Sequence, residues 1–431
     1  MAGSAARTAP PARGRSRPLL PAFMPSLAAC GLAGLLLLVV LGPYMTYRPG
    51  SAGEGSPVRQ VLYLGAALLV AAGARVWADP RRLLPIAAPV AAVLGWCWLS
   101  LAWSEVPGLA LRRLVLTTLV VWTLFAAVRE LGYLRSLAIF RGIAIFALAG
   151  NILVVALWPE FGVHHMTEDG DPSVVGAWCG MMISKNFAGA MCAITVLAFF
   201  FDPRGMPAWL RWGVIVGAIV FLWGSASKTS AGIGLAGMAC GLLFMRYNPA
   251  YRALIVPVVM VAGGVGAVLI ALNWWRVVAI LYDPQAFTGR ATIWAALVAY
   301  HRDHWLGTGY GSFWNVGVGV GPIFEYGRGW ITEITSGHNG YLDLLAQIGT
   351  PGVVLVILGL IAWPIARLLA SLQVGRAEGA LPLSIVVFSA GHNLTESTLL
   401  DRDAIGQVFL MLAVAFVAEL TRRPQVRSSH G

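Results

Sequence analysis

Residues 253–272, ALIVPVVMVAGGVGAVLIAL, contain no charged side chain, and the long polar stretch Asn273 to Gly340 follows them directly. Twenty apolar residues form a helix of about 30 Å, which matches the hydrocarbon core of a bilayer. Binding and catalytic residues concentrate on loops that a rigid scaffold holds in place. We therefore expect the function of this chain to lie in or near its long polar loop.

The composition is that of an integral membrane protein. Of 431 residues, 58% are hydrophobic and 11% are charged, which is too little polar surface for a water-soluble globule. About twelve apolar stretches, of some 17–25 residues each, could cross the bilayer as helices. We expect an all-α polytopic protein, because lipid leaves no water to satisfy open backbone groups. The predicted spans are approximately 21–43, 58–77, 84–102, 109–128, 138–158, 174–201, 208–225, 229–245, 253–272, 341–362, 381–395 and 404–420.

These spans divide the chain into five parts. We expect a disordered tail over 1–20, nine helices within 21–272, a large loop with an amphipathic helix over 273–340, three helices within 341–420, and a second tail over 421–431. Arginine is frequent in every loop on the side of the N-terminal tail, which places both tails in the cytoplasm. Nine crossings then put the large loop in the periplasm of a bacterial inner membrane.

The net charge of +11 follows from this topology. The excess arginines face anionic cytoplasmic lipid, so we expect membrane lipid and no nucleic acid as a partner. The five cysteines all lie in apolar stretches, and the histidines lack metal-binding spacing. We therefore expect no disulfide, no metal and no other cofactor.

Two lysines stand where lipid should exclude them. Lys185 lies inside the predicted span 174–201, where a charged side chain costs about 2.5–3.5 kcal/mol on insertion scales. It lines a wet cavity and binds substrate, or it reaches the interface, or it pairs with an acid such as Glu168. Lys228 lies in a short outer turn rich in small hydroxyl residues, which leaves room for a ligand; an ordinary interfacial lysine is the alternative.

Residues 290–301 predict an amphipathic helix on the outer surface, because their apolar residues recur at helical spacing. Thr288 or Gly289 would be its N-cap, so Arg290 falls in the first turn, where the helix dipole and bare amides also favour anions. This combination predicts an anion site. An arginine held by lipid headgroups is the alternative.

His338 lies in Gly337-His338-Asn339-Gly340, at the mouth of the predicted tenth span. A neutral imidazole there can accept a proton near physiological pH, as a general base does. A hydrogen-bonded structural histidine is the alternative.

The run GTGYG at 307–311 predicts a turn that lets the backbone approach other elements. It is too short and too far from any strand to be a nucleotide fingerprint. Tyr310 within it could stack on a sugar ring, although an aromatic belt at the interface explains this tyrosine equally well.

Several of these motifs, in this order, resemble the signature of the O-antigen ligase and Wzy-type polymerase superfamily. They are Arg290-x-x-Ile293-Trp294, Gly307-x-Gly309-x-Gly311-x-Phe313 and Gly337-His338-Asn339-x-Tyr341-Leu342, followed by Gly349 and Gly352. The resemblance covers roughly residues 175–360. The element Lys185-Asn186-x-x-Gly189 is most similar to the ExoQ-like exopolysaccharide polymerases.

The resemblance implies a metal-independent glycosyltransferase whose active face is periplasmic. Its donor would be an undecaprenyl-pyrophosphate-linked glycan, and its acceptor a glycan or a second lipid-linked glycan. By position, Arg290 and Lys228 would bind the pyrophosphate, and His338 would take the acceptor proton in an inverting single displacement. We also expect Lys185, Asn339 and Tyr310 to contact substrate. Chain-length regulators or export proteins are possible partners.

The chain departs from the family motif at one position, and three other functions also have to be considered. Ligases of the family typically carry arginine where this chain has Lys228, which keeps the charge but loses the bidentate fork. The nearest rival function is an O-antigen ligase that loads a finished glycan onto lipid A core. A flippase or transporter also fits the composition, but its polar residues should gather near the bilayer midplane. A scaffold would need no cation facing a wet cavity.

Overall fold

The computed structural model describes residues 26–46, 56–166, 174–273, 275–276, 279, 289–317 and 321–422. The predicted tail 1–20, and all but two residues of the tail 421–431, lie outside these ranges. The described part of the chain is helical, with one isolated bridge between Val163 and Trp178 and no strand. The all-α prediction is confirmed.

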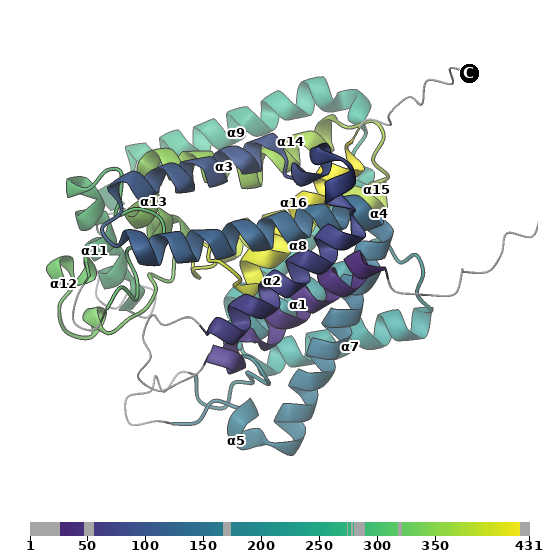
Figure 1. Cartoon of the computed structure of the whole chain (residues 1–431), viewed down its shortest axis with the longest axis horizontal. Coiled ribbons are helices and arrows are strands. Elements are labelled where there is room, and N and C mark those ends of the chain that lie inside the picture. Colours follow the sequence, from purple (N-terminus) through teal and green to yellow (C-terminus); the bar gives the residue numbers. More distant parts are fainter. Residues whose placement is uncertain are drawn as a thin grey trace, which may run out of the picture.

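Most helices follow the apolar stretches that the sequence predicts (Figure 1). Their bounds are α1 Leu27–Thr46, α2 Pro57–Gly73, α3 Ala88–Leu99, α4 Pro107–Leu157, α5 Pro159–Gly162, α6 Lys185–Phe200, α7 Ala208–Gly224, α8 Lys228–Arg246, α9 Arg252–Leu272, α11 Arg290–Asp303, α12 Ile323–Tyr326, α13 Gly340–Val356, α14 Trp363–Ala370, α15 Arg376–His392 and α16 Ile405–Leu420. A π-helical segment, Ile357–Ala362, joins α13 to α14.

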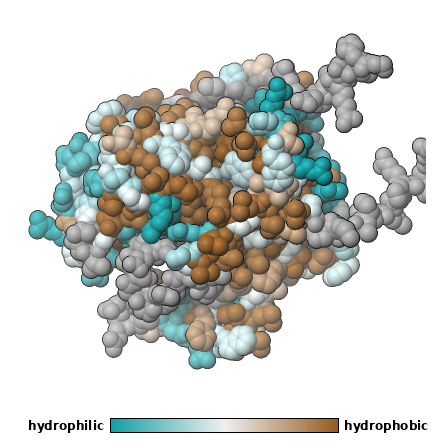
Figure 2. Space-filling model, viewed as in Figure 1, coloured by the Kyte–Doolittle hydropathy of each residue, from teal (hydrophilic) through white to brown (hydrophobic). Residues whose placement is uncertain are grey.

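Three helical segments are long and apolar enough to cross a membrane: Pro107–Leu157, Lys228–Arg246 and Gly340–Ala370. The first, α4, covers two predicted spans and bends at Gly132, whose backbone leaves the helical region. Apolar residues cover much of the middle of the face shown in Figure 2, and hydrophilic residues gather toward the end that carries α11 and α12 and toward the opposite end. These features indicate a membrane protein.

The start of α6 differs from the sequence expectation. The predicted span began at residue 174, whereas α6 begins at Lys185. Residues 174–184 form turns, and their backbone is held by other loops: Trp178 N donates to Gly224 O, at the end of α7, over 2.9 Å. Hydropathy alone cannot separate such an apolar, non-helical segment from the helix that follows it. Lys185 therefore opens a helix and does not lie within one.

The loop after α9 has a small hydrophobic core of its own, separate from the core of the bundle. Side chains of α11 pack there against residues of the following loop and of α13. The buried members are Ile293, Trp294, Ala296, Leu297, Tyr300, Phe313, Trp314, Ile323 and Ala346. The amphipathic helix is present as predicted, but other parts of the protein cover its apolar face, whereas the sequence predicts a helix that lies on the outer surface. Aromatic residues later in the loop supply this cover.

The GTGYG run forms the predicted close turn. Gly309 has φ +90°, and a Cβ built there would lie 2.8 Å from the Ser104 Cα, so the turn lies directly against the segment between α3 and α4. Tyr310 N donates to Ser100 Oγ over 2.9 Å. These contacts anchor the loop to the bundle and hold α11 beside the start of α13.

Candidate functional site

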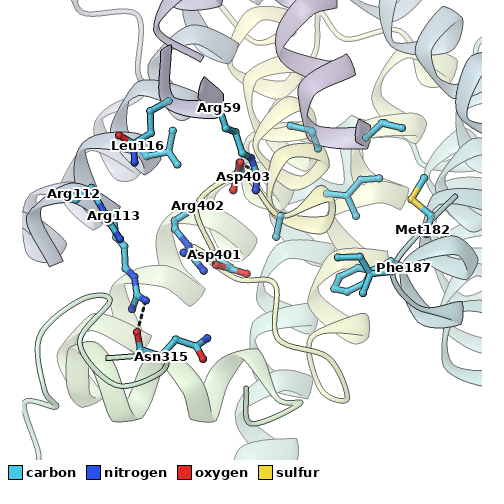
Figure 3. A pocket seen from close by; sticks show the side chains of 16 residues that line it. Arg59, Arg112, Arg113, Leu116, Met182, Phe187, Asn315, Asp401, Arg402 and Asp403 are labelled. Atoms are coloured by element: carbon cyan, nitrogen blue, oxygen red, sulfur yellow. Dashed lines mark hydrogen bonds and ion pairs between the residues drawn. The ribbon is translucent and has the colours of Figure 1, made fainter. Parts of the chain in front are cut away.

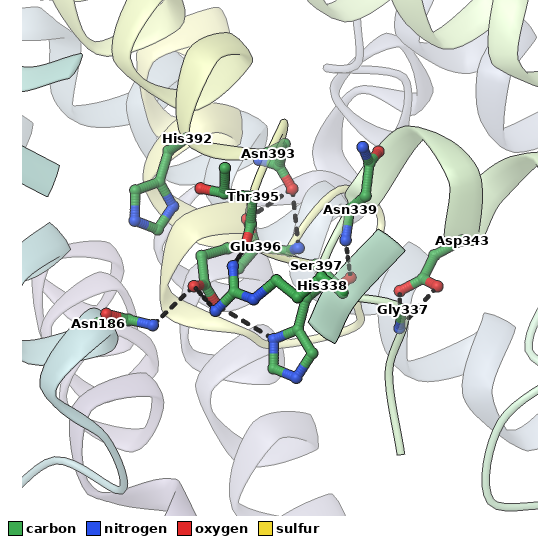
Figure 4. Close-up of polar contacts among 12 residues, drawn as sticks. Asn186, Gly337, His338, Asn339, Asp343, His392, Asn393, Thr395, Glu396 and Ser397 are labelled. Atoms are coloured by element: carbon green, nitrogen blue, oxygen red, sulfur yellow. Dashed lines mark hydrogen bonds and ion pairs between the residues drawn. The ribbon is translucent and has the colours of Figure 1, made fainter. Parts of the chain in front are cut away.

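Two polar clusters lie at the end of the bundle where α6, α8, α11 and α13 begin. One lines a cavity (Figure 3), and the other includes Arg290 and His338, two of the residues that the sequence singles out (Figure 4). They are neighbours along the chain: Phe187 lines the cavity and Asn186 belongs to the second cluster.

Three cationic residues occupy the first position of three helices. Lys185 opens α6, Lys228 opens α8 and Arg290 opens α11. The N-cap residue of each helix makes no side-chain cap, although the first amide of α6 donates to His164 Nε2. An uncapped start leaves backbone N–H groups and the positive end of the dipole available to an anion. The prediction that Arg290 falls in the first turn, behind a Gly289 N-cap, is confirmed.

Glu396, between α15 and α16, joins these helix starts. Its Oε1 accepts a hydrogen bond from Asn186 Nδ2 at 2.7 Å and lies 3.2 Å from Arg290 Nη2, while its Oε2 lies 3.7 Å from His338 Nδ1. Asn186 also links to α8, because Ser227 Oγ donates to Asn186 Oδ1 over 3.3 Å. One buried carboxylate thus holds residues of α6 and α11 and the loop before α13 in one place (Figure 4).

The charge state of Glu396 follows from these neighbours. Burial raises the pKa of this carboxyl, but the nearby His338 imidazole and the charges of Arg290 and His392 outweigh burial and lower the pKa below its usual value. Glu396 is therefore ionised at neutral pH. An ionised buried carboxylate needs charged and hydrogen-bonding partners, which the helix starts supply.

Arg290 is held by two contacts and keeps an exposed surface. Its Nη1 donates to the carbonyl oxygen of Thr395, and its Nη2 donates to Glu396 Oε1. The side chain is 21% exposed. A guanidinium fixed along one edge keeps other N–H groups for a phosphate oxygen. Arg290 can therefore bind an anion without first having to be ordered.

Lys185 and Lys228 are less constrained. No residue in the described ranges forms a hydrogen bond or ion pair with either ammonium group. The backbone N–H of Lys185 donates to His164 Nε2 over 3.2 Å. This bond anchors the backbone at the start of α6, whereas no residue in the described part of the chain holds the Lys185 side chain. The proposed partner Glu168 lies outside the described residues. Binding of substrate by these two lysines stays a prediction.

His338 has a strained backbone and an available ring nitrogen. Its φ is +50°, in the left-handed region, which costs a non-glycine residue on the order of 1–3 kcal/mol. The flanking amides hold this conformation: Gly337 N donates to Asp343 Oδ1, and Asn339 N donates to Ser397 Oγ. The Nδ1 atom faces Glu396, and among the described residues none bonds to Nε2. At 38% exposure, the imidazole can reach a ligand.

Asn339 and Tyr310 have structural contacts. The Asn339 side chain caps α13 by accepting from the amides of Tyr341 and Leu342, and its Nδ2 donates to Leu394 O. Tyr310 is buried, and its hydroxyl lies 2.7 Å from Thr117 Oγ1. It lines a second cavity, of about 80 Å³. Substrate contact by these two residues stays a prediction.

The segment that carries Glu396 is docked on the start of α13. Gly340 N donates to both Asn393 O and Glu396 O, at 2.9 and 3.0 Å. A Cβ at position 340 would lie 2.4 Å from Asn393 Oδ1, so only glycine allows this approach. The Asn393 amide oxygen also accepts from Thr398 N and Leu399 N. These bonds fix the carboxylate relative to His338.

Sequence reasoning missed Glu396 and the role of Asn186. The signal was the polar run HNLTEST at 392–398, which separates the last two apolar stretches and contains a single acid. His392, in the same run, is buried, and its Nε2 lies 3.2 Å from Ser230 Oγ. Its burial makes it a support of the site, whereas His338 is open to a ligand.

A pH dependence of stability follows from Glu396. Its folded pKa is lowered, so the network stabilises the fold above the unfolded glutamate pKa of about 4.3, and this stabilisation is lost as the pH falls through the lower folded value. In detergent, Glu396→Gln should lower the melting temperature at pH 7, and the gap from the unsubstituted protein should narrow below about pH 4. Glu325→Gln, exposed on α12, is the control. A gap that stays constant to pH 3 contradicts this account.

No protein-family model matches this chain, and a search of curated proteins found no similar sequence. Within the described ranges, no group of three or more His, Cys, Asp or Glu side chains is placed to hold a metal ion. The site offers three cations, one open imidazole and one buried carboxylate.

Proposed function

We propose that the protein is a polytopic enzyme of a bacterial inner membrane, with twelve crossings and both tails in the cytoplasm. Counting the two halves of α4 separately, and α13 to α14 as one crossing, the helices α1 to α4, α6 to α9 and α13 to α16 supply that number. The basic loops support this orientation. It places the starts of α6, α8, α11 and α13 at the periplasmic end.

We propose that the enzyme is a glycosyltransferase that joins undecaprenyl-pyrophosphate-linked oligosaccharide repeats into an exopolysaccharide or O-antigen. The observation that carries the proposal is that Lys185, Lys228 and Arg290 all open helices around the Glu396–His338 pair. A lipid pyrophosphate is an anion that reaches such a site from the membrane. The resemblance of the sequence motifs to the O-antigen ligase and polymerase superfamily points to the same reaction.

The cations act on the leaving group. As the bond between the anomeric carbon and the pyrophosphate oxygen breaks, its electron pair leaves with undecaprenyl pyrophosphate. Arg290 is already oriented by Glu396 and Thr395 and can bind the developing negative charge with little reorganisation. Lys185 and Lys228 approach the same oxygens from α6 and α8. No nucleotide is needed, because the donor bond supplies the energy.

His338 acts on the acceptor. With Nδ1–H directed at Glu396, the Nε2 lone pair can take the proton of an acceptor hydroxyl while that oxygen attacks the anomeric carbon. Glu396 stabilises the imidazolium that results. One displacement inverts the anomeric configuration. The proton remains on His338 until it is released to solvent or to the pyrophosphate.

The test is transfer in a purified system. Protein in detergent is given synthetic undecaprenyl-pyrophosphate oligosaccharide without nucleotide or ion gradient, and with chelator present. We expect glycan joined through an inverted linkage, together with released undecaprenyl pyrophosphate. The contradicting result has two parts: no product forms with any donor and acceptor, and the same protein reconstituted in vesicles still moves lipid-linked glycan across the bilayer. That combination favours a flippase.

The acceptor decides between polymerase and ligase. The two activities share donor binding, loss of the acceptor proton and release of pyrophosphate, so the same residues serve both. Offering a second lipid-linked repeat in one reaction and lipid A core in another separates them. We propose the polymerase, because Lys185-Asn186-x-x-Gly189 resembles the exopolysaccharide branch and Asn186 holds Glu396.

A further inference from the structure

A second polar cluster, beside the Glu396 site, lines a cavity of about 330 Å³ (Figure 3). Its walls come from α1, α2, the start of α4, the start of α6 and the segment between α15 and α16. The volume falls at the lower end of small-molecule sites, which span about 300–1,000 Å³. Arg290, His338 and Glu396 do not line this cavity. It is therefore a separate site at the same end of the bundle.

Arginine dominates the polar wall of the cavity. Arg59, Arg112, Arg113 and Arg402 line it, and Asp401 and Asp403 are the acids beside them. Arg59 pairs with Asp403, and Arg402 with Asp401 over 3.1 Å. Among the residues that line the cavity, guanidinium groups thus outnumber carboxylates. Guanidinium groups match the geometry of phosphate oxygens.

Some of these guanidinium donors have no acceptor in the described part of the chain. Arg113 is 7% exposed and donates to the carbonyls of Trp314 and Asn315 at 2.8 and 3.0 Å, yet its Nε is buried without a hydrogen-bond partner. Arg59 Nε is buried without one as well. An unsatisfied buried donor costs on the order of 1–3 kcal/mol, so such groups call for an acceptor.

The backbone that carries the cluster is also strained. Arg402 has φ +36°, and Asn315, on the facing loop, has φ +53°. Left-handed backbone at non-glycine residues is concentrated where a surrounding structure holds side chains for function. Arg402 lies on the same segment as Glu396, six residues further on, so the two sites share one element.

The opposite wall is apolar. Val39 and Val40 come from α1, Met182 and Ile183 come from the turns before α6, and Phe187 comes from the first turn of α6. Figure 3 shows Met182 and Phe187 across the cavity from the arginines. Ile183 is 63% exposed, so this wall continues onto the surface of the protein. A soluble anion would leave this apolar wall facing water, whereas the tail of an amphiphile would cover it.

We propose that this cavity binds the phosphate headgroup of a lipid, with the phosphate on the arginines and the first carbons of the tail against Val39, Val40 and Phe187. The binding does not depend on the proposed reaction. Its use as the place of the second lipid-linked substrate rests on the proposed function. The shared segment from Glu396 to Asp403 would then set the distance between two lipid phosphates.

The test measures how many amphiphiles each variant binds. Full-length protein in detergent is titrated with farnesyl phosphate, and bound copies are counted by native mass spectrometry. Farnesol lacks the headgroup, and inorganic phosphate lacks the tail. We expect two bound copies, one lost in Arg290→Ala and the other in Arg402→Gln. Arg328→Gln, exposed on the loop after α12, should bind both. Phe187→Ala should weaken farnesyl phosphate at the arginine-lined cavity and leave inorganic phosphate unaffected.

Each outcome bears on the proposal. Loss of one copy in Arg402→Gln, with both retained in Arg328→Gln, supports it even if no variant transfers glycan. Unchanged binding in both Arg402→Gln and Arg112→Gln overturns it. If inorganic phosphate occupies the cavity as fully as farnesyl phosphate does, the cavity binds a soluble anion. If farnesol does so, the arginines do not recognise the ligand. Either result also overturns the proposal. Transfer that fails while the Arg402-dependent copy persists contradicts the proposed function alone.

Discussion

Arg290→Ala is expected to lower the rate of glycan transfer by about 10²- to 10³-fold, the usual loss when one preorganised donor to a developing charge is removed. The arginine is fixed by Thr395 O and Glu396 Oε1 before any ligand arrives. Its contribution therefore does not include the cost of ordering a long side chain. The measurement is the initial rate of pyrophosphate-linked donor consumption in detergent.

Arg290→Lys separates charge from geometry. Lysine keeps the positive charge but cannot contact the Thr395 carbonyl and Glu396 with a single planar fork. We expect a rate between those of the unsubstituted protein and the alanine variant. Arg302→Ala is the matched control, because Arg302 is an exposed arginine on the same helix. A rate for Arg290→Ala within twofold of the control contradicts the assignment of Arg290 to the leaving group.

Misfolding is a competing explanation for a loss of rate, because Arg290→Ala leaves Glu396 buried with one charged partner fewer. Adding Glu396→Gln to Arg290→Ala removes that unpaired charge. The double variant should regain melting temperature relative to Arg290→Ala, and melting temperature is the readout here, because Glu396→Gln is itself expected to lower transfer. Recovery of transfer together with stability would assign Arg290 a structural role only.

The helices could be predicted from the sequence because lipid permits few alternatives. An uncharged run such as 253–272 is long enough to be a spanning helix, and α9 is found there. Helix starts were less predictable. Residues 174–184 are as apolar as a span, but their backbone bonds run to the ends of α5 and α7, contacts that hydropathy does not contain.

The cations of the site could be predicted because they break a local rule. Lys185 and Lys228 are isolated positive charges beside apolar segments, and Arg290 opens an amphipathic helix; in the proposed orientation all three lie on the outer side, where positive charges are unexpected. Their convergence depends on tertiary structure. It requires that α6, α8 and α11 begin at the same end and that one residue joins them.

Glu396 could not be found from local sequence. Three acids, Glu396, Asp401 and Asp403, lie between the last two helices, and although the polar run HNLTEST marks this segment, nothing within it distinguishes Glu396 from a solvated carboxylate. Its position depends on Gly340, which allows the segment to dock on the start of α13. Any side chain at position 340 would place its Cβ 2.4 Å from Asn393 Oδ1. Only the folded chain brings Asn186, some two hundred residues earlier, within 2.7 Å of the carboxylate.

The coupling of His338 and Glu396 gives the second large expected effect. His338→Ala should lower transfer by about 10²- to 10⁴-fold, the range that a positioned general base contributes. Glu396→Gln should lower it by a similar factor, because glutamine keeps the size of the side chain but not the charge that orients Nδ1 and stabilises the imidazolium. Rates are measured with saturating donor, so that weakened binding does not enter.

The decisive comparison is the double variant. If Glu396 acts through His338, then Glu396→Gln adds at most about threefold to the loss already caused by His338→Ala, because residues that act as a unit are not additive. His301→Ala is the control, since His301 also lies in the loop but contacts Thr350. Multiplicative losses would show that Glu396 serves Arg290 and the leaving group instead. The base would then need no carboxylate, and the 3.7 Å separation of Nδ1 and Oε2 would have no part in the proton transfer.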